Sequence, residues 1–109
     1  NLILRGDRGL SQFTAKAWIS WTGVSTTAIL DSHGISSVSD GGTGQTTINY
    51  SNNFANANYA AGAMSGNRKV LVFETGSKAV GSSVVYTQDH NDATNEADTA
   101  YNTVIFFGD

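Results

Sequence analysis

The chain has 109 residues, a formal net charge of −3 and no cysteine. This length fits one domain with a modest core, and the lack of cysteine excludes disulfides and thiolate-bound zinc. The six basic residues are scattered, which argues against nucleic acid as a partner, and no apolar run approaches the roughly 20 residues that span a bilayer. We therefore expect no nucleic-acid binding, no membrane insertion and no signal peptide.

Apolar residues alternate with polar ones or stand in short blocks between Gly, Asn, Asp and Ser, and helical spacing is hard to find. This pattern is typical of β-strands separated by turns. About eight strands are predicted, at residues 15–21, 24–30, 35–39, 46–50, 58–64, 69–75, 80–88 and 101–108. Their spacing predicts an all-β fold, an antiparallel β-sandwich.

The first strands are distinguished by their aromatic and β-branched residues. Residues 15–21 place Trp21 on one face of a strand and Trp18 on the other. Residues 24–30 are rich in β-branched side chains, and 31–34 (DSHG) is expected to separate this strand from the next.

A glycine-rich stretch follows, DGGTG at residues 40–44. Nucleotide-binding loops use glycine in this way, but such a loop needs a Lys after its last glycine and a helix behind it. Gln45 stands at that position and a strand-like run follows. The stretch therefore predicts the turn of a β-hairpin.

Two further connections are expected between strands. Residues 51–57 are polar, could hold one helical turn, and offer Phe54 as an anchor into the core. Residues 89–100 have no apolar spacing and are predicted to form a loop.

Three stretches together carry a family resemblance: KAWISWTG (16–23), ILDSHGISSVSDGGTGQTTINYS (29–51) and ANYAAGAM (57–64). In order and spacing they resemble a module at the carboxyl end of bacteriophage tail fibres and related virion proteins, and the final TVIFFGD (103–109) is similar to the closing strand of such fibres. Trp21 stands where the family pattern has phenylalanine, and Gln45 where it has aspartate.

The resemblance implies a distal tail-fibre domain of the virion that recognises a glycan or protein on the bacterial surface. It also implies a homotrimer, because tail fibres are generally built from three parallel chains. The chain starts at Asn1 rather than Met, which suggests a fragment or processed product. On this interpretation residues 1–14 lead in from an upstream shaft, and residues 15–109 form the single sandwich domain.

The acidic stretch at 89–98 holds four carboxylates and one histidine within ten residues. Oxygen-rich clusters bind hard cations, which makes Asp89, Asp92 and Glu96 weak candidates for a metal site. The spacing does not match a 12-residue calcium loop, and a charge run of this kind is usually a solvated surface loop.

Catalysis is not expected. A Ser-His-Asp site would need His33 or His90 beside a nucleophile, and the sequence has no G-x-S-x-G turn. The prediction is a protein without enzymatic activity and without a cofactor.

Aromatic residues favour a binding module, because their rings stack on sugars while Asn and Asp side chains bond to hydroxyls. The aromatic candidates are Trp18, Trp21, Tyr50, Tyr59, Tyr86 and Tyr101. The predicted ligand-binding residues are Trp21, Tyr86, His90, Asn91, Asp92 and Asn95. The alternative is that both tryptophans are buried, one in the sandwich and one between subunits.

Receptor recognition is the leading function that this sequence predicts. One alternative is a structural module that trimerises the fibre and sets its register. Another is the accessory binding domain of a polysaccharide-degrading tailspike, whose cleavage site would need two carboxylates in a groove.

Overall fold

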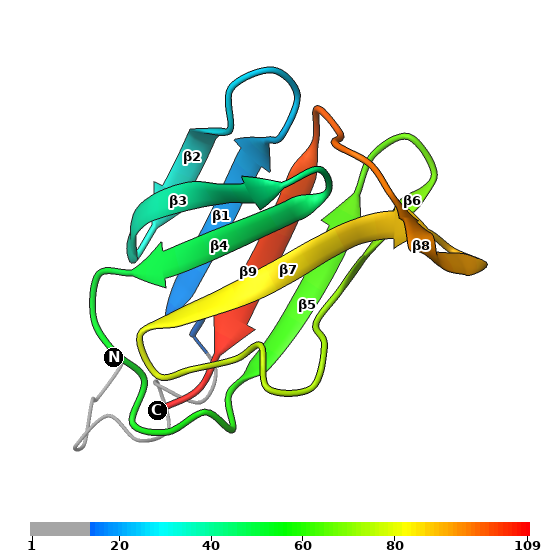
Figure 1. The fold of residues 1–109 in the computed structure, drawn as a ribbon. Coiled ribbons are helices and arrows are strands. Elements are labelled where there is room, and N and C mark those ends of the chain that lie inside the picture. Colours follow the sequence, from blue (N-terminus) through cyan, green and yellow to red (C-terminus); the bar gives the residue numbers. More distant parts are fainter. Residues whose placement is uncertain (1–13) are drawn as a thin grey trace.

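The computed structural model describes residues 14–109, apart from the side chains of residues 92–94. Nine strands and no helix occur in this range, arranged as two antiparallel sheets packed as a sandwich (Figure 1). The strands are β1 (Ala17–Thr22), β2 (Ala28–His33), β3 (Ile35–Gly42), β4 (Gln45–Tyr50), β5 (Ala60–Ser65), β6 (Lys69–Val72), β7 (Ser82–Asp89), β8 (Asp92–Glu96) and β9 (Asn102–Phe107). Within residues 14–109 no helix is long and apolar enough to cross a membrane. The predicted all-β sandwich is confirmed, while the predicted lead-in at 1–14 lies outside the described residues except for Thr14.

The first sheet has the strand order β2-β1-β9-β5, and the second has the order β3-β4-β7-β6 with β8 added on β7. β6 pairs with the last residues of β7 along one of its edges, so β8 occupies the other edge beyond the end of β4. Figure 1 shows the β7–β8 hairpin at one end of the second sheet. The sandwich therefore has β2 and β3 as edge strands on one side, and β5 and β6 as edge strands on the other.

The core lies between the two sheets, and the strands bury alternate residues as the period of 2 predicts. In β1, β4 and β9 every second side chain is buried. Trp21 is 1% exposed and is the largest of the fully buried side chains, while Trp18, on the opposite face of β1, is only half-buried. One tryptophan thus fills the core, and burying an aromatic side chain of this size stabilises the fold by about 3 kcal/mol.

An aromatic cluster closes the sandwich near the C-terminal end of the chain. Phe54 is buried, as predicted, and stacks on Tyr59 at 4.1 Å between ring centroids, although residues 51–57 form no helical turn. The Tyr50 hydroxyl donates to Tyr59 Oη at 2.9 Å, and that hydroxyl donates to the Ala79 carbonyl at 2.9 Å. Burial raises the pKa of Tyr50 far above its ordinary value, so this hydroxyl stays protonated and keeps donating.

The DGGTG stretch is the turn of the β3–β4 hairpin, as predicted. Gly42 pairs with Gln45, leaving Thr43 and Gly44 as the loop. Gly44 has φ 69°, and a Cβ at this position would lie 2.7 Å from the Thr87 carbonyl oxygen. Only glycine fits, because both the left-handed conformation and the close approach of β7 exclude a side chain.

The second strand lies further along the chain than predicted. Residues 24–27 form a loop in which Ser25 has φ 64°, and β2 runs instead from Ala28 to His33. The turn expected at residues 31–34 between the second and third strands consists of Gly34 alone, whose φ is 73°. A Cβ there would lie 2.7 Å from the Lys16 carbonyl oxygen, so a single glycine allows the chain to pass from one sheet to the other.

The loop predicted at 89–100 contains a strand, β8, which pairs with β7. The prediction was wrong because it required apolar alternation. β8 pairs with β7 through backbone groups, and directly after β8 the N–H of Ala97 donates to the Thr87 carbonyl at 3.0 Å; both strands are polar here.

Candidate functional site

Three connections gather at one end of the sandwich, the upper end in Figure 1: the β1–β2 loop, the β5–β6 turn and the β8–β9 connection. They enclose an open cleft of about 380 Å³. Its lining residues are Val24, Gly66, Asn67, Asp98, Thr99, Ala100 and Tyr101. Binding sites are commonly built in this way, from loops held by a rigid sheet.

Backbone hydrogen bonds fix the three connections to one another. Gly23 N–H donates to the Thr99 carbonyl at 2.9 Å, and Gly66 N–H donates to the Tyr101 carbonyl at 2.7 Å. The cleft is thus formed by segments far apart in the sequence that the β1–β9 and β5–β9 pairings bring together.

A buried polar network lies beneath the cleft and is centred on Asn102, which is 2% exposed. Its Oδ1 accepts from Ser65 Oγ at 2.8 Å and from Thr99 Oγ1 at 2.5 Å. Its Nδ2 donates to the Thr99 carbonyl at 3.1 Å and to the Trp21 carbonyl at 3.4 Å. These bonds hold the start of β9, and with it Tyr101, in one position relative to β1 and β5.

Strained backbone is concentrated in the loops of this end. Asn67 and Arg68 both have positive φ, 57° and 61°, and form a tight turn closed by Lys69 N–H donating to the Gly66 carbonyl at 3.1 Å. Ser25 in the β1–β2 loop is also left-handed. Such conformations cost about 1 kcal/mol or more per residue and are enriched at functional sites. The turn places Asn67 among the residues that line the cleft.

The lining combines apolar and polar groups. Tyr101 is 71% exposed and Val24 is 45% exposed, so the cleft presents an aromatic and an aliphatic residue to solvent. Asn67 supplies an amide and Asp98 a carboxylate. Asp98 is held in place because its Oδ1 accepts from Gly44 N–H at 2.7 Å. An aromatic ring beside an amide and a fixed carboxylate is suited to binding a polyhydroxylated ligand.

The cleft does not hold the paired groups of a hydrolytic site. Among the described residues that line it, Asp98 is the single carboxylate and there is no histidine. Glycoside cleavage uses two carboxyl groups roughly 5–9.5 Å apart. The arrangement can hold a ligand by stacking and hydrogen bonding.

The residues predicted from the sequence to bind a ligand lie elsewhere. Trp21 is in the core, where a ligand at the surface does not reach its ring. Tyr86 is half-buried in β7, opposite Gln45 of β4. His90 and Asn91 are exposed at the tip of the β7–β8 hairpin.

Around Asp89 the structure shows an ion pair. Lys69 Nζ forms a salt bridge with Asp89 Oδ1, and Asn95 Nδ2 donates to Asp89 Oδ2. The hydrogen bond from Lys69, together with that from Asn95, lowers the pKa of Asp89 below its ordinary value. Asp92 belongs to β8 with its side chain outside the description, and Glu96 pairs with Gln88 in the β7–β8 ladder.

Among the described side chains, no group of three His, Asp or Glu residues is placed to hold a metal ion.

The sequence signals for the cleft were weak but present. Tyr101 belongs to the aromatic residues singled out as sugar-stacking candidates, and Asp98 to the acidic stretch. The sequence pattern does not single out Val24 or Asn67, because it places Val24 in a strand and Asn67 in an ordinary turn. The feature that would have singled out Asn67 is its place in the tight turn between two strands, where Asn tolerates positive φ.

Comparison with known proteins gave no match: no family model, no curated protein and no solved structure matches this chain.

Proposed function

We propose that this chain is a receptor-recognition domain of a bacteriophage tail fibre that binds a glycan of the bacterial surface in the loop cleft, without cleaving it. The observation that carries the proposal is the exposure of Tyr101, 71% of the residue, at a cleft that Asn67 and Asp98 also line. The assignment to a virion rests on the resemblance of residues 16–64 to tail-fibre modules.

The composition of the cleft supports a sugar ligand. A sugar ring has an apolar face that stacks on an aromatic ring, and its hydroxyls bond to amides and carboxylates. Tyr101 offers the stacking surface. The amide of Asn67 can donate and accept hydrogen bonds, and the carboxylate of Asp98 can accept them. The backbone bonds from Gly23 and Gly66 hold these groups in place before binding, which reduces the entropy lost on association.

An open cleft with one exposed ring supports weak binding by each copy. A fibre compensates by carrying several copies, because the second and third contacts form at the high effective concentration that the shared scaffold provides. The homotrimer implied by the resemblance stays a prediction, and the avidity argument holds for any number of copies above one.

The alternative role, fibre assembly, has its own supporting observation. Several apolar side chains are exposed on the strands of the first sheet, Leu30, Met64, Ile105 and Phe107 among them. Exposed apolar surface of this kind often marks contacts between proteins. An accessory domain of a polysaccharide-degrading tailspike would use the same cleft for the same kind of ligand.

The test measures binding of the domain to bacterial cells and to their purified surface polysaccharides. Tyr101→Ala is expected to weaken binding at least tenfold, because the stacking surface is lost, while Tyr101→Phe keeps the ring and most of the affinity. Thr103→Ala, at an exposed position of β9 two residues after Tyr101, is the matched control and is expected to bind like the wild type. Undiminished binding by Tyr101→Ala contradicts the assignment of the cleft, and absence of binding to every polysaccharide tested contradicts the recognition role.

A further inference from the structure

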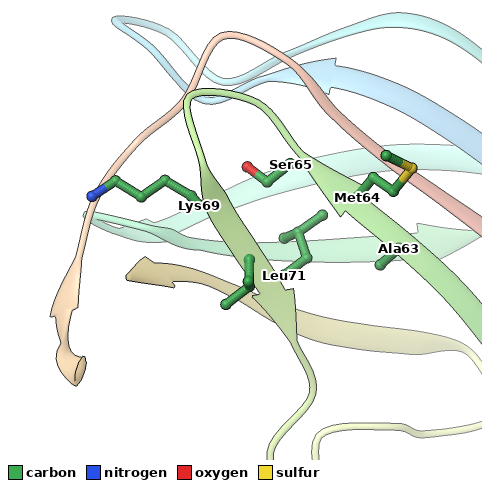
Figure 2. Close-up of a pocket in the computed structure, with 6 residues that line it drawn as sticks. Ala63, Met64, Ser65, Lys69 and Leu71 are labelled. Carbon is green, nitrogen blue, oxygen red and sulfur yellow. The ribbon is translucent and has the colours of Figure 1, made fainter. Parts of the chain in front are cut away.

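On one side of the sandwich both sheets end in an edge strand, β5 in the first sheet and β6 in the second. The outer edge of each of these strands is not paired with any other described strand. A cavity of about 330 Å³ lies between them. Figure 2 shows Ala63, Met64 and Ser65 along β5 on one side of this cavity and Lys69 and Leu71 along β6 on the other. We call this side of the molecule the β5–β6 seam.

The β5 edge lacks the features that normally prevent strands from pairing between molecules. Its six residues, Ala60–Ser65, pair with β9 in a continuous register without a bulge. They include no charged residue and no proline. Natural edge strands are usually protected by charges, prolines, bulges or covering loops, so a regular, uncharged edge is a template for another strand.

The opposite side of the sandwich does carry such protection. The pairing of β2 with β1 is interrupted by a register shift between Ser20 and Trp21, and β2 contains Asp31 and His33. The pairing of β3 with β4 has two such shifts, and β3 contains Asp40. The difference between the two sides indicates that the β5–β6 seam is the one suited to meet another chain.

The hydrogen bonds identify which backbone groups of β5 face outward. Gly66 N–H donates to the Tyr101 carbonyl, and these two residues continue the register of the β5–β9 ladder. In an antiparallel ladder, residues that bond to the neighbouring strand alternate with residues that do not. The N–H and C=O groups of Ala61 and Ala63 therefore point away from β9, toward the open edge.

Gly62, at the middle of β5, is not required by any contact among the residues that the structure describes. A Cβ at this position would meet nothing within 4 Å. Glycine inside a strand weakens it, and it often marks a place where another backbone comes close. A glycine that no described contact requires, at the centre of an uncharged edge, points to a neighbour other than the described part of this chain.

We infer that β5 pairs in antiparallel fashion with β5 of a second copy of this chain, around a twofold axis at Gly62. In this register Gly62 faces the partner's Gly62, and Met64 faces the partner's Ala60. Met64 is 74% exposed and is the one long side chain of the strand, so each methionine lies over the small residues of the other copy. Because β5 is uncharged, the pairing brings no like charges together.

The pairing also covers the cavity at the seam. Ala63, Leu71 and Val70 give it a largely apolar lining, and the ammonium group of Lys69 is engaged by Asp89. When the two copies meet, the inward-facing alanines of the partner strand come to lie over this apolar lining. The pairing thus extends the first sheet across both chains and removes apolar surface from water.

The test is the mass of the domain in solution, by light scattering across a concentration series, for the wild type and two variants. A mass of two 11.5 kDa chains is expected for the wild type. Gly62→Lys and Gly62→Glu each place like charges directly opposite one another at the axis and are expected to raise the dissociation constant at least tenfold. Both variants are expected to fold, because the position is open within the single chain. An equal mixture of the two is expected to recover the dimer as a mixed pair.

Leu30→Lys, an exposed position on the far edge strand of the same sheet, is the control and is expected to stay dimeric. Hydrogen exchange gives a second measurement: the amides of Ala61 and Ala63 are expected to be protected in the dimer and to exchange freely in Gly62→Lys. A monomeric wild type, or a dimer that survives Gly62→Lys, overturns the inference. So does a trimer, because a twofold pairing of β5 with β5 joins two chains and cannot close a ring of three. None of these outcomes bears on whether the cleft at Tyr101 binds a glycan.

Discussion

Replacing Asn102 with alanine removes the centre of the polar network beneath the cleft. Asn102 accepts from the hydroxyls of Ser65 and Thr99, which also lie 2.9 Å from each other. These two hydroxyls have two hydrogens for three contacts, so only two of the three bonds form at any one time. After the substitution the hydroxyls still bond to each other. The losses are therefore one O–H bond and the two N–H bonds to the carbonyls of Thr99 and Trp21.

Each of these bonds contributes about 1 kcal/mol net, and the Thr99 carbonyl keeps its hydrogen bond from Gly23 N–H after the substitution. The sum is a loss of roughly 3 kcal/mol in the free energy of unfolding. For a domain of this size, that corresponds to a fall in Tm of about 10–25 °C.

The assay is equilibrium unfolding in urea, followed by circular dichroism and by tryptophan fluorescence. Thr103→Ala, the exposed neighbour on β9, is the control and is expected to change stability by less than about 0.5 kcal/mol. A change below about 1 kcal/mol for Asn102→Ala would refute the reasoning, because it would mean that water or the backbone satisfies the network equally well.

Three further predictions concern the fold. Gly44→Ala is expected to destabilise the domain by about 2 kcal/mol or more, since it combines a left-handed backbone with a Cβ 2.7 Å from the Thr87 carbonyl; unchanged urea unfolding would contradict this. Trp21→Ala is expected to cost about 3–5 kcal/mol by the same measurement, and a cost near zero would show that the ring is not a core residue. The salt bridge with Lys69 lowers the pKa of Asp89, so its stabilising effect is fully present above the ordinary aspartate pKa and is lost as the pH falls through the lowered value. Stability measured against pH is therefore expected to fall less on acidification in Asp89→Asn than in the wild type, and identical acid profiles would exclude this contribution.

Most of the strands and turns could be predicted from the sequence, because the local pattern of apolar residues, polar residues and glycines determines them. Alternation in residues 15–21 predicts a strand whatever it pairs with, and the glycines at 40–44 predict a turn. The failures have one physical cause, which is that strand pairing is decided by the partner. β8 is polar and forms through backbone bonds to β7, and the β-branched residues at 24–27 lie in a loop because the pairing with β1 begins at Ala28.

The cleft could not be predicted for a related reason. Asn67 and Tyr101 come together only because β5 and β9 are neighbours in the first sheet, an order that the sequence pattern does not determine. The sequence favours residues that are close together in the chain, such as His90 and Asn91, as ligand-binding residues. In the structure these two residues lie at the tip of the β7–β8 hairpin and do not line the cleft. The search for aromatic residues did include Tyr101 among the candidates for binding a sugar. It also included Trp21, which lies in the core.

The most direct test of glycan recognition is an amide and side-chain NMR titration of the domain with oligosaccharides released from bacterial surface polysaccharides. We expect chemical-shift changes at the Asn67 side-chain amide and at the backbone amides of Asp98 and Tyr101, with the rest of the sandwich unchanged. Changes confined to the hairpin tip at His90 and Asn91 would contradict the assignment of the site, and a flat titration with every oligosaccharide would contradict glycan recognition itself.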